Sequence, residues 1–271
     1  MKRALMLAVM LLATEMSGFA QTGPKILRFE PNGPGGVGLK GNDRDSSKIY
    51  HYYKSNADER VAAGIWSSPD FSGRMRKVTN TEFIYVLEGA VTLLDKSGRE
   101  ETFKVGDAVV IPRGTEFQWK KSDNLKEYWV IFDREAPPRP GSGQAGTPAP
   151  QGTPTFFKLD RNGPAGKGLA GTGRTREHEY FSGPDGSSVG VWETQPHTSA
   201  NFHKTKYAEL MVFLSGNVTL TTPDGQTEKF KAGEVAFVPK GIEYKWSSDT
   251  TRKYWVIFDN DPPTKSSAGA R

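Results

Sequence analysis

The chain carries one pattern of residues twice, and this duplication constrains its fold more than any other feature. Two glycines, a proline and a tryptophan of the first copy all return 127 positions later: Gly106, Pro112, Gly114 and Trp119 recur as Gly233, Pro239, Gly241 and Trp246. The segment from Tyr128 to Asp133 also returns unchanged at residues 254–259. So many landmarks in one order indicate a tandem duplication. We expect two domains, called here the first repeat (residues 25–134) and the second repeat (residues 155–260).

Within each repeat the pattern predicts short β-strands. Residues 82–87 and 90–93 are rich in β-branched and aromatic residues and are separated by Gly89. Hairpin-type turns follow at Ser97-Gly98 and Asp224-Gly225, and no window of useful length shows helical spacing. The 30 glycines and 18 prolines of the chain suit a protein with many turns. We therefore expect an all-β fold of two barrels or sandwiches in tandem.

Three segments outside the repeats predict how the chain is delivered and connected. Residues 1–20 have a basic start, an apolar run and small residues before Gln21, which is typical of a cleaved secretory signal peptide. The alternative, an uncleaved membrane anchor, needs about 20 apolar residues, and the run here is shorter. Residues 135–154 predict a Pro/Gly-rich linker, and residues 261–271 predict a flexible tail. We expect an exported protein, periplasmic or secreted, with no membrane contact after signal cleavage.

Composition narrows the partners and the chemistry. The chain has no cysteine, which excludes disulfides and thiolate metal sites. Its net charge is +5, but the basic residues are scattered along the sequence. A solvated surface explains such a distribution better than a polyanion site does, so nucleic acid is not expected as a partner.

Glutamates, glycines and prolines recur at fixed spacings in both repeats. In the first repeat, six residues separate Glu82 from Gly89, and Gly106 precedes Pro112. The second repeat has the same set at Glu209, Gly216, Gly233 and Pro239. These spacings resemble the two motifs of the cupin superfamily, and the whole chain resembles a bicupin. The resemblance implies two tandem double-stranded β-helix, jelly-roll-like barrels that bury against each other, often with an edge strand of one completing the other's sheet.

Further matched features are Trp66 and Trp119 of the first repeat, Trp192 and Trp246 of the second, and residues 126–128 and 252–254, which lead into the last strands. These features resemble a cupin subgroup that includes ureidoglycine aminohydrolase. In a typical cupin, three histidines and one glutamate converge inside the barrel on Mn, Fe, Ni or Zn. Two of these histidines stand two residues apart on one strand, so that both point to the same face.

The first repeat departs from this metal pattern. Its first two histidine positions hold Arg76 and Val78 or, counted one residue earlier, Met75 and Lys77. Phe117 stands at the third histidine position, and only Glu82 survives. We therefore interpret Arg76, Glu82, Phe117 and Trp119 as structural residues, with Arg76 and Glu82 as an expected ion pair.

The second repeat keeps half of the pattern. His203 and Glu209 stand at a histidine and the glutamate position, whereas Thr205 and Tyr244 replace the other two histidines. One imidazole and one carboxylate form an incomplete set for Mn, Fe, Ni or Zn unless His197 or Gln195 joins them.

The second repeat is also where a ligand pocket is expected. The candidate pocket residues are Asn201, His203, Glu209, Tyr244 and Trp246. Each has a purely structural alternative: Glu209 pairing with Lys204 or Lys206, His203 in hydrogen-bonded packing, and the aromatic residues filling the core.

Three functions remain open from the sequence. The first is binding of a small polar ligand, for which the loss of metal ligands within a retained barrel framework is the motive. The second is a metal-dependent hydrolase or isomerase, in which Glu209 or His203 would move a proton. The third is an envelope scaffold without a pocket. Both a monomer and a homo-oligomer are compatible with each function.

Overall fold

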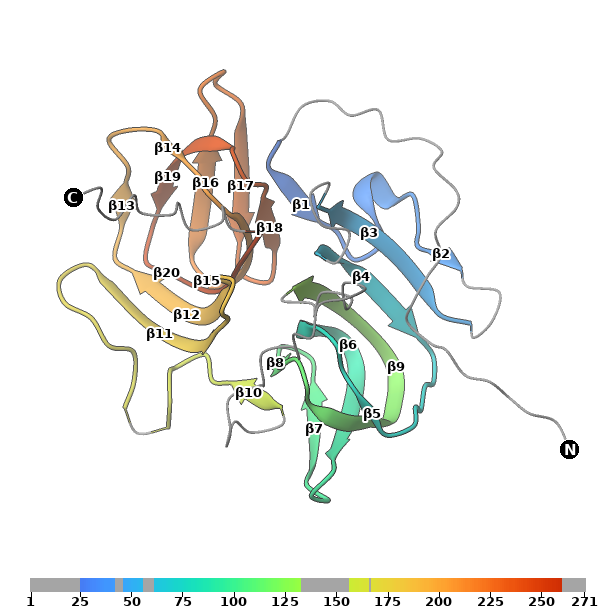
Figure 1. Cartoon of the computed structure of the whole chain (residues 1–271). Helices are drawn as coiled ribbons and strands as arrows, with labels where there is room; N and C mark the ends of the chain where they lie inside the picture. Colours follow the sequence, from blue (N-terminus) through green and yellow to red (C-terminus); the bar gives the residue numbers. More distant parts are fainter. Residues whose placement is uncertain (1–24, 42–45, 56–60, 133–155, 166, 260–271) are drawn as a thin grey trace, which may run out of the picture.

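A computed structural model describes residues 25–41, 46–55, 61–132, 156–165 and 167–259. The predicted signal peptide (1–20), linker (135–154) and tail (261–271) lie outside the described residues. Over the described ranges the chain is built from strands, with a single three-residue 3-10 turn at Pro34–Gly36 and no α-helix (Figure 1). No helix in these ranges is long and apolar enough to span a membrane. The expected all-β class is confirmed.

The first repeat forms one curled sheet of nine strands, ordered β10-β8-β6-β9-β4-β3-β2, with β5 attached to β9 and β7 attached to β6. Its own strands are β1 (Leu27–Phe29), β2 (Lys40–Gly41), β3 (Lys48–Lys54), β4 (Ala62–Ser68), β5 (Arg76–Lys77), β6 (Thr81–Asp95), β7 (Glu100–Lys104), β8 (Ala108–Ile111) and β9 (Glu116–Phe132). The long strands β6 and β9 continue from one half of the curled sheet into the other half. These two facing halves are called here the walls of the repeat.

In the second repeat the corresponding strands form two separate sheets. One has the order β1-β18-β15-β20-β12-β11, and the other has the order β13-β19-β16-β17 with β14 attached to β19. The strands are β10 (Phe157–Leu159), β11 (Thr175–Ser182), β12 (Ser188–Thr194), β13 (His197–Thr198), β14 (His203–Lys204), β15 (Ala208–Ser215), β16 (Asn217–Thr221), β17 (Thr227–Lys231), β18 (Val235–Val238), β19 (Glu243–Ser248) and β20 (Thr251–Phe258).

Matched glycines mark the bend between the two walls of each repeat. Gly89 has φ +69°, and a Cβ added there would lie 2.0 Å from the carbonyl oxygen of Asp123, so only glycine fits. The expected break at Gly89 is a bulge within the continuous strand β6, whereas at Gly216 the second repeat divides into β15 and β16.

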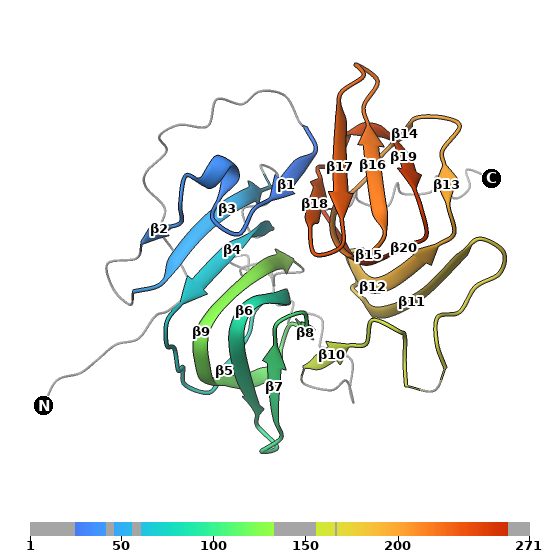
Figure 2. The ribbon, with the colours of Figure 1, turned by 180° about the vertical axis from the view of Figure 1, so that it is seen from behind.

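Each repeat lends its first strand to the other. Strand β1 pairs with β18 of the second repeat, and β10 pairs with β8 of the first (Figures 1 and 2). Tyr128 donates a hydrogen bond of 2.8 Å to the carbonyl of Phe29 on β1, and Tyr254 donates one of 3.0 Å to Leu159 on β10. The exchange expected from the bicupin resemblance is therefore present, and it covers sheet edges that would otherwise be exposed.

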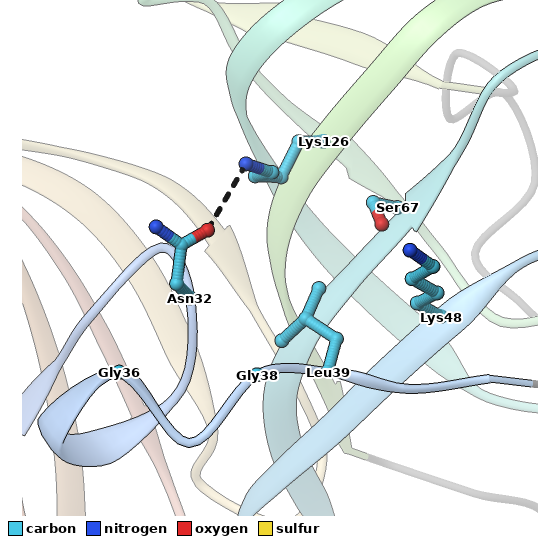
Figure 3. Close-up of a pocket in the computed structure, with 7 residues that line it drawn as sticks. All are labelled: Asn32, Gly36, Gly38, Leu39, Lys48, Ser67 and Lys126. Carbon is cyan, nitrogen blue, oxygen red and sulfur yellow. Dashed lines mark hydrogen bonds between the residues drawn. The ribbon is translucent and has the colours of Figure 1, made fainter.

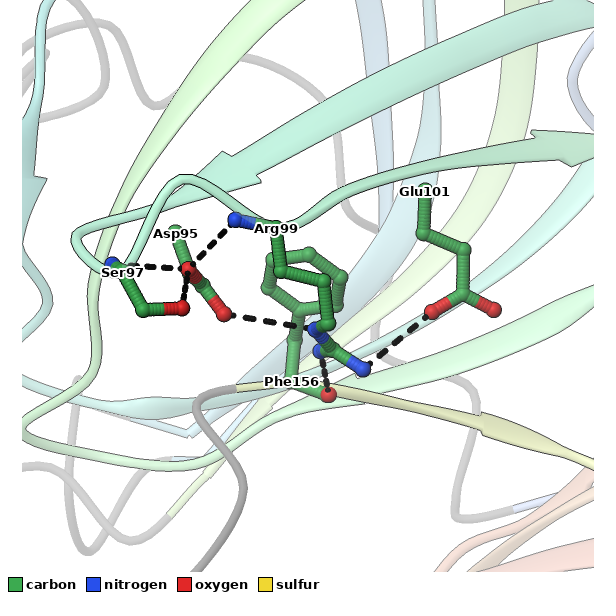
Figure 4. Close-up of polar contacts among 5 residues, drawn as sticks. All are labelled: Asp95, Ser97, Arg99, Glu101 and Phe156. Carbon is green, nitrogen blue, oxygen red and sulfur yellow. Dashed lines mark hydrogen bonds and ion pairs between the residues drawn. The ribbon is translucent and has the colours of Figure 1, made fainter.

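A second tie between the repeats is made by Arg99, which lies in the turn between β6 and β7. Its guanidinium pairs with Asp95 at 3.3 Å and with Glu101 at 3.5 Å, donates to the carbonyl of Phe156 at 2.5 Å, and lies 4.4 Å from the centroid of the Phe156 ring (Figure 4). Phe156 itself is fully buried in the first repeat's interior, immediately before β10.

The molecule has three apolar clusters. The largest lies between the repeats and draws on both, through residues such as Phe29, Tyr128, Phe237 and Phe258. The other two fill the interiors of the first and second repeats. Hydrogen bonds among the described strands do not close either repeat into a ring, so each "barrel" is a jelly-roll-like sandwich with its apolar interior between two walls.

Candidate functional site

A buried ion pair lies at the centre of the second repeat's interior. Glu209 on β15 and Lys253 on β20 are only 6% and 8% exposed, and the Nζ of Lys253 lies 2.6 Å from Oε1 of Glu209. Glu209, Met211 and Phe213 stand two residues apart on β15 and therefore share one face of the strand. Met211 and Phe213 belong to the interior cluster, so the carboxylate of Glu209 also faces inward. The pair keeps a positive and a negative charge together away from water.

Two tryptophans cover the ammonium group of this pair. The Nζ of Lys253 is 5.3 Å from the ring centroid of Trp192 and 5.2 Å from that of Trp246, within the range of cation–π attraction. The two rings meet edge to face, 5.6 Å apart, and the indole N–H of Trp246 donates to Ser248. Lys253 thus occupies an aromatic cage with a carboxylate at its base.

The other predicted pocket residues differ in their burial. Tyr244 is buried, and its pKa is raised by burial and by the charge of Glu209. The ring of exposed His203 lies edge-on to Tyr244 at 6.4 Å, and Asn201 is exposed on the preceding loop. The structure therefore groups Glu209, Tyr244 and Trp246 in the interior, with His203 and Asn201 at its rim.

These residues do not fit a tightly held transition metal in the second repeat. The carboxylate of Glu209 is already paired with an ammonium group, which would repel a divalent ion. Thr205, at a histidine position, donates its hydroxyl to the backbone carbonyl of Pro239 at 3.1 Å. Among the described residues, no three His, Asp or Glu side chains form a group able to hold a metal ion.

The residue missed by the sequence analysis is Lys253. The structural alternative for Glu209 is a pair with Lys204 or Lys206, but both are exposed, and the partner in the structure lies 44 positions along the chain. The available signal was the comparison of the copies, because Lys253 replaces Glu127 in otherwise similar segments.

The first repeat has a carboxyl group in place of the lysine at the matched position. Glu127 is 3% exposed and lies opposite Trp66 and Val86, both in contact with the interior cluster. Its Oε2 is buried with no hydrogen-bond partner. The pKa of Glu127 is raised well above its ordinary value by burial and then by the charge of half-buried Glu82.

The residues interpreted as structural in the first repeat occupy two environments. Phe117 and Trp119 are buried in the interior cluster. Arg76 is exposed on β5, with its guanidinium 5.4 Å from the Phe117 ring centroid. Burial raises the pKa of Glu82, and the charge of Arg76 opposes that rise. The expected ion pair is wrong, because exposed Arg76 lies over the Phe117 ring and forms no ion pair with Glu82 among the described residues.

His51, on β3 of the first repeat, should make the stability of the fold depend on pH. It packs edge to face on Trp129 at 5.2 Å, its Nδ1 is buried without a partner, and burial together with Lys54 lowers its pKa to about 4. The unfolded chain binds a proton here near pH 6.5, whereas the folded chain does not. Unfolding is therefore favoured as the pH falls, and we expect a loss of about 2 kcal/mol between pH 6.5 and pH 4. Urea unfolding across this range should show a shallower pH slope in His51→Phe, and an unchanged slope would contradict the assignment.

A surface pocket of about 550 Å³ lies outside this interior, between the 3-10 turn and strands β3, β4 and β9. Asn32, Leu39, Lys48 and Lys126 contribute to its lining (Figure 3). The ammonium of Lys126 is held by Glu88 at 2.6 Å and by Asn32 at 3.5 Å. The lining of this pocket is both polar and apolar, and none of the predicted site residues belongs to it.

Comparison with known proteins identifies the family. Residues 55–127 and 182–255, together more than half of the chain, match the EutQ-like cupin domain. The chain belongs to the EutQ-like cupin family. The two matches fall one in each repeat, so the cupin resemblance and the tandem arrangement are confirmed. The ureidoglycine aminohydrolase-like subgroup stays a prediction. No curated protein matches the chain.

Solved structures agree with this cupin fold. A protein of unknown function from Pseudomonas syringae pv. tomato is 21% identical, with a TM-score of 0.65 over 87% of this chain and 100% of its own. A cupin 2 conserved barrel domain protein from Leptotrichia buccalis is 13% identical, with a TM-score of 0.56 over 80% and 92%. Protein Ylba from E. coli is 12% identical, with a TM-score of 0.54 over 89% and 94%. At these identities the likeness shows the fold alone.

Proposed function

We propose that this EutQ-like cupin is a binding protein for a small polar ligand, which enters the second repeat at His203 and Asn201. The observation that carries the proposal is the caged ion pair of Lys253 and Glu209. An ammonium group has three N–H donors, and a single bond to Glu209 leaves two for a ligand. Tyr244 adds a hydroxyl, and Trp246 adds an apolar wall. An apolar interior with a few convergent polar groups is the usual form of a small-molecule site.

The preferred ligand is one that offers hydrogen-bond acceptors, such as a small carboxylate. Lys253 supplies a positive charge at a place where a metal ion supplies one in metal-binding cupins. The low dielectric of the interior strengthens the attraction of this charge for an anionic group. The sequence also favours binding over catalysis, because residues other than histidine stand at most of the metal-ligand positions of the cupin pattern.

Thermal-shift screening of the full chain against small carboxylates, polar metabolites and divalent metals tests this proposal. A ligand at a hundred times its Kd should stabilise the fold by about 2.7 kcal/mol and raise the Tm by several degrees. The shift should shrink in Tyr244→Phe and His203→Ala, whereas Lys40→Ala, at an exposed position on β2 of the first repeat, should behave like the wild type. An absence of any response, or a response equal in all variants, would contradict the proposal.

Export belongs to the same proposal and is supported by the pattern of residues 1–20. Expression of the full chain in a bacterial host, followed by cell fractionation and N-terminal sequencing, should yield a mature chain beginning at Gln21 outside the cytoplasm. A cytoplasmic product that retains Met1 would contradict it.

A further inference from the structure

The two repeats carry the same cage with different centres. Trp192 and Trp246 of the second repeat correspond to Trp66 and Trp119 of the first, and Glu209 corresponds to Glu82. The Lys253 position corresponds to Glu127. Each central residue pairs across strands with its own tryptophan: Lys253 lies opposite Trp192, and Glu127 lies opposite Trp66.

The second repeat shows what such a cage holds. Its centre is a primary ammonium group between two indole rings, with a carboxylate 2.6 Å away. This cation is part of the chain. The ammonium group of Lys253 therefore takes the cation position of the second repeat's cage.

The first repeat has the walls of the cage but no such cation. Trp66, Phe71 and Trp119 form an aromatic triad, with pairwise centroid distances of 6.0, 6.0 and 6.1 Å. In place of the lysine stands a second carboxyl group, and Oε2 of that Glu127 is buried without a partner. An unpaired buried carboxyl oxygen is costly, and an unexplained one points to a missing partner.

Charge and access indicate which partner is missing. The titratable or charged groups that face the interior near Glu127 are Glu82 on β6, Arg76 at the rim on β5 and His51 on β3, beside Trp129. Arg76 is exposed and lies on Phe117, so it does not reach the Oε2 of Glu127. Trp66, Phe71 and Glu82 are half-buried, so this end of the interior lies near the surface.

We propose that the first repeat binds a small organic ammonium ion between Trp66 and Trp119, with its charge against Glu127 and Glu82. Aromatic rings attract an ammonium group through their negatively polarised faces, and the paired carboxylates add the opposite charge. This site is separate from the proposed ligand site of the second repeat, so failure of one leaves the other standing.

Binding should be coupled to proton release. Burial and the charge of Glu82 raise the pKa of Glu127, so this carboxyl holds a proton in the empty site more readily than in water. A bound cation favours the ionised form and expels that proton. The affinity for a cation of fixed charge should therefore rise between pH 5 and pH 8.

Isothermal titration calorimetry of the full chain with choline is the test. We expect binding that strengthens with pH, with heats that depend on the ionisation enthalpy of the buffer. Glu127→Gln should weaken the affinity about tenfold, which corresponds to the loss of one charge contact. The matched control Glu88→Gln removes an exposed carboxylate of β6 and should leave the affinity unchanged. The uncharged carbon analogue of choline should bind at least about tenfold more weakly than choline.

A second variant gives the first repeat the lysine that the second repeat has at the matched position. Glu127→Lys should place an ammonium group in the cage beside Glu82, abolish choline binding and raise the Tm. The proposal is overturned if choline does not bind the wild type, if its carbon analogue binds equally well, or if binding survives in Glu127→Gln unchanged. It is also overturned if Mn²⁺ binds through Glu127 while choline does not, because the carboxyl pair would then serve a metal ion.

Discussion

Lys253→Met should lower the free energy of unfolding by about 3 to 5 kcal/mol at pH 8, because it leaves the carboxylate of Glu209 buried without its partner. Methionine keeps most of the length and volume of the lysine, so the loss reports the missing charge rather than a cavity. Urea unfolding monitored by tryptophan fluorescence measures this loss.

Two further variants separate the ion pair from general effects of the substitution. Lys204→Met removes an exposed lysine next to His203 and should cost less than about 0.5 kcal/mol. The double variant Lys253→Met with Glu209→Leu removes both charges and should recover most of the loss, since apolar residues often replace a buried pair at little cost. If Lys253→Met costs no more than Lys204→Met, the pair is not the buried centre described above.

Phe237→Ala should cost about 3 to 5 kcal/mol, because the ring is fully buried where the two repeats meet. Phe237 belongs to the second repeat, yet its ring centroid lies 5.7 Å from Phe29 and 4.8 Å from Tyr53, both of the first repeat. It also lies 5.9 Å from Phe258. Loss of this ring should destabilise both repeats, which should still unfold in one transition.

Chemical denaturation followed by far-UV circular dichroism and by tryptophan fluorescence tests this expectation. Phe202→Ala is the matched control, because Phe202 is 36% exposed and lies outside the apolar clusters. Its cost should be below about 1 kcal/mol. Two separate transitions in Phe237→Ala, or a cost equal to that of Phe202→Ala, would contradict a shared core.

Much of the fold was predictable because the chain repeats its own landmarks. The recurrence of Gly106, Pro112 and Gly114 showed two equivalent domains, and the alternation of apolar residues showed strands. The exchange of β1 and β10 was expected from the bicupin resemblance. The continuity of β6 through Gly89 was not, because a bulge and a chain break share the same local sequence signal.

The centre of each interior was harder to predict. Alternation places Glu127 on the same face as Trp129, but it does not say which face is buried. The ion pair of Lys253 and Glu209 joins strands 44 residues apart, and no local rule brings those two side chains together. Alignment of the repeats on each other was the only route to it, since it sets lysine against glutamate at one position.

Elemental analysis tests most directly whether protein charges take the place of a metal. The purified full chain is incubated with Mn, Fe, Ni and Zn, and free ions are removed before the measurement. We expect less than about a tenth of an equivalent of any transition metal, because one exposed imidazole and a carboxylate already paired with lysine are too few ligands. Retention of one equivalent that depends on His203 and Glu209 would contradict the account and favour the metal-dependent hydrolase or isomerase.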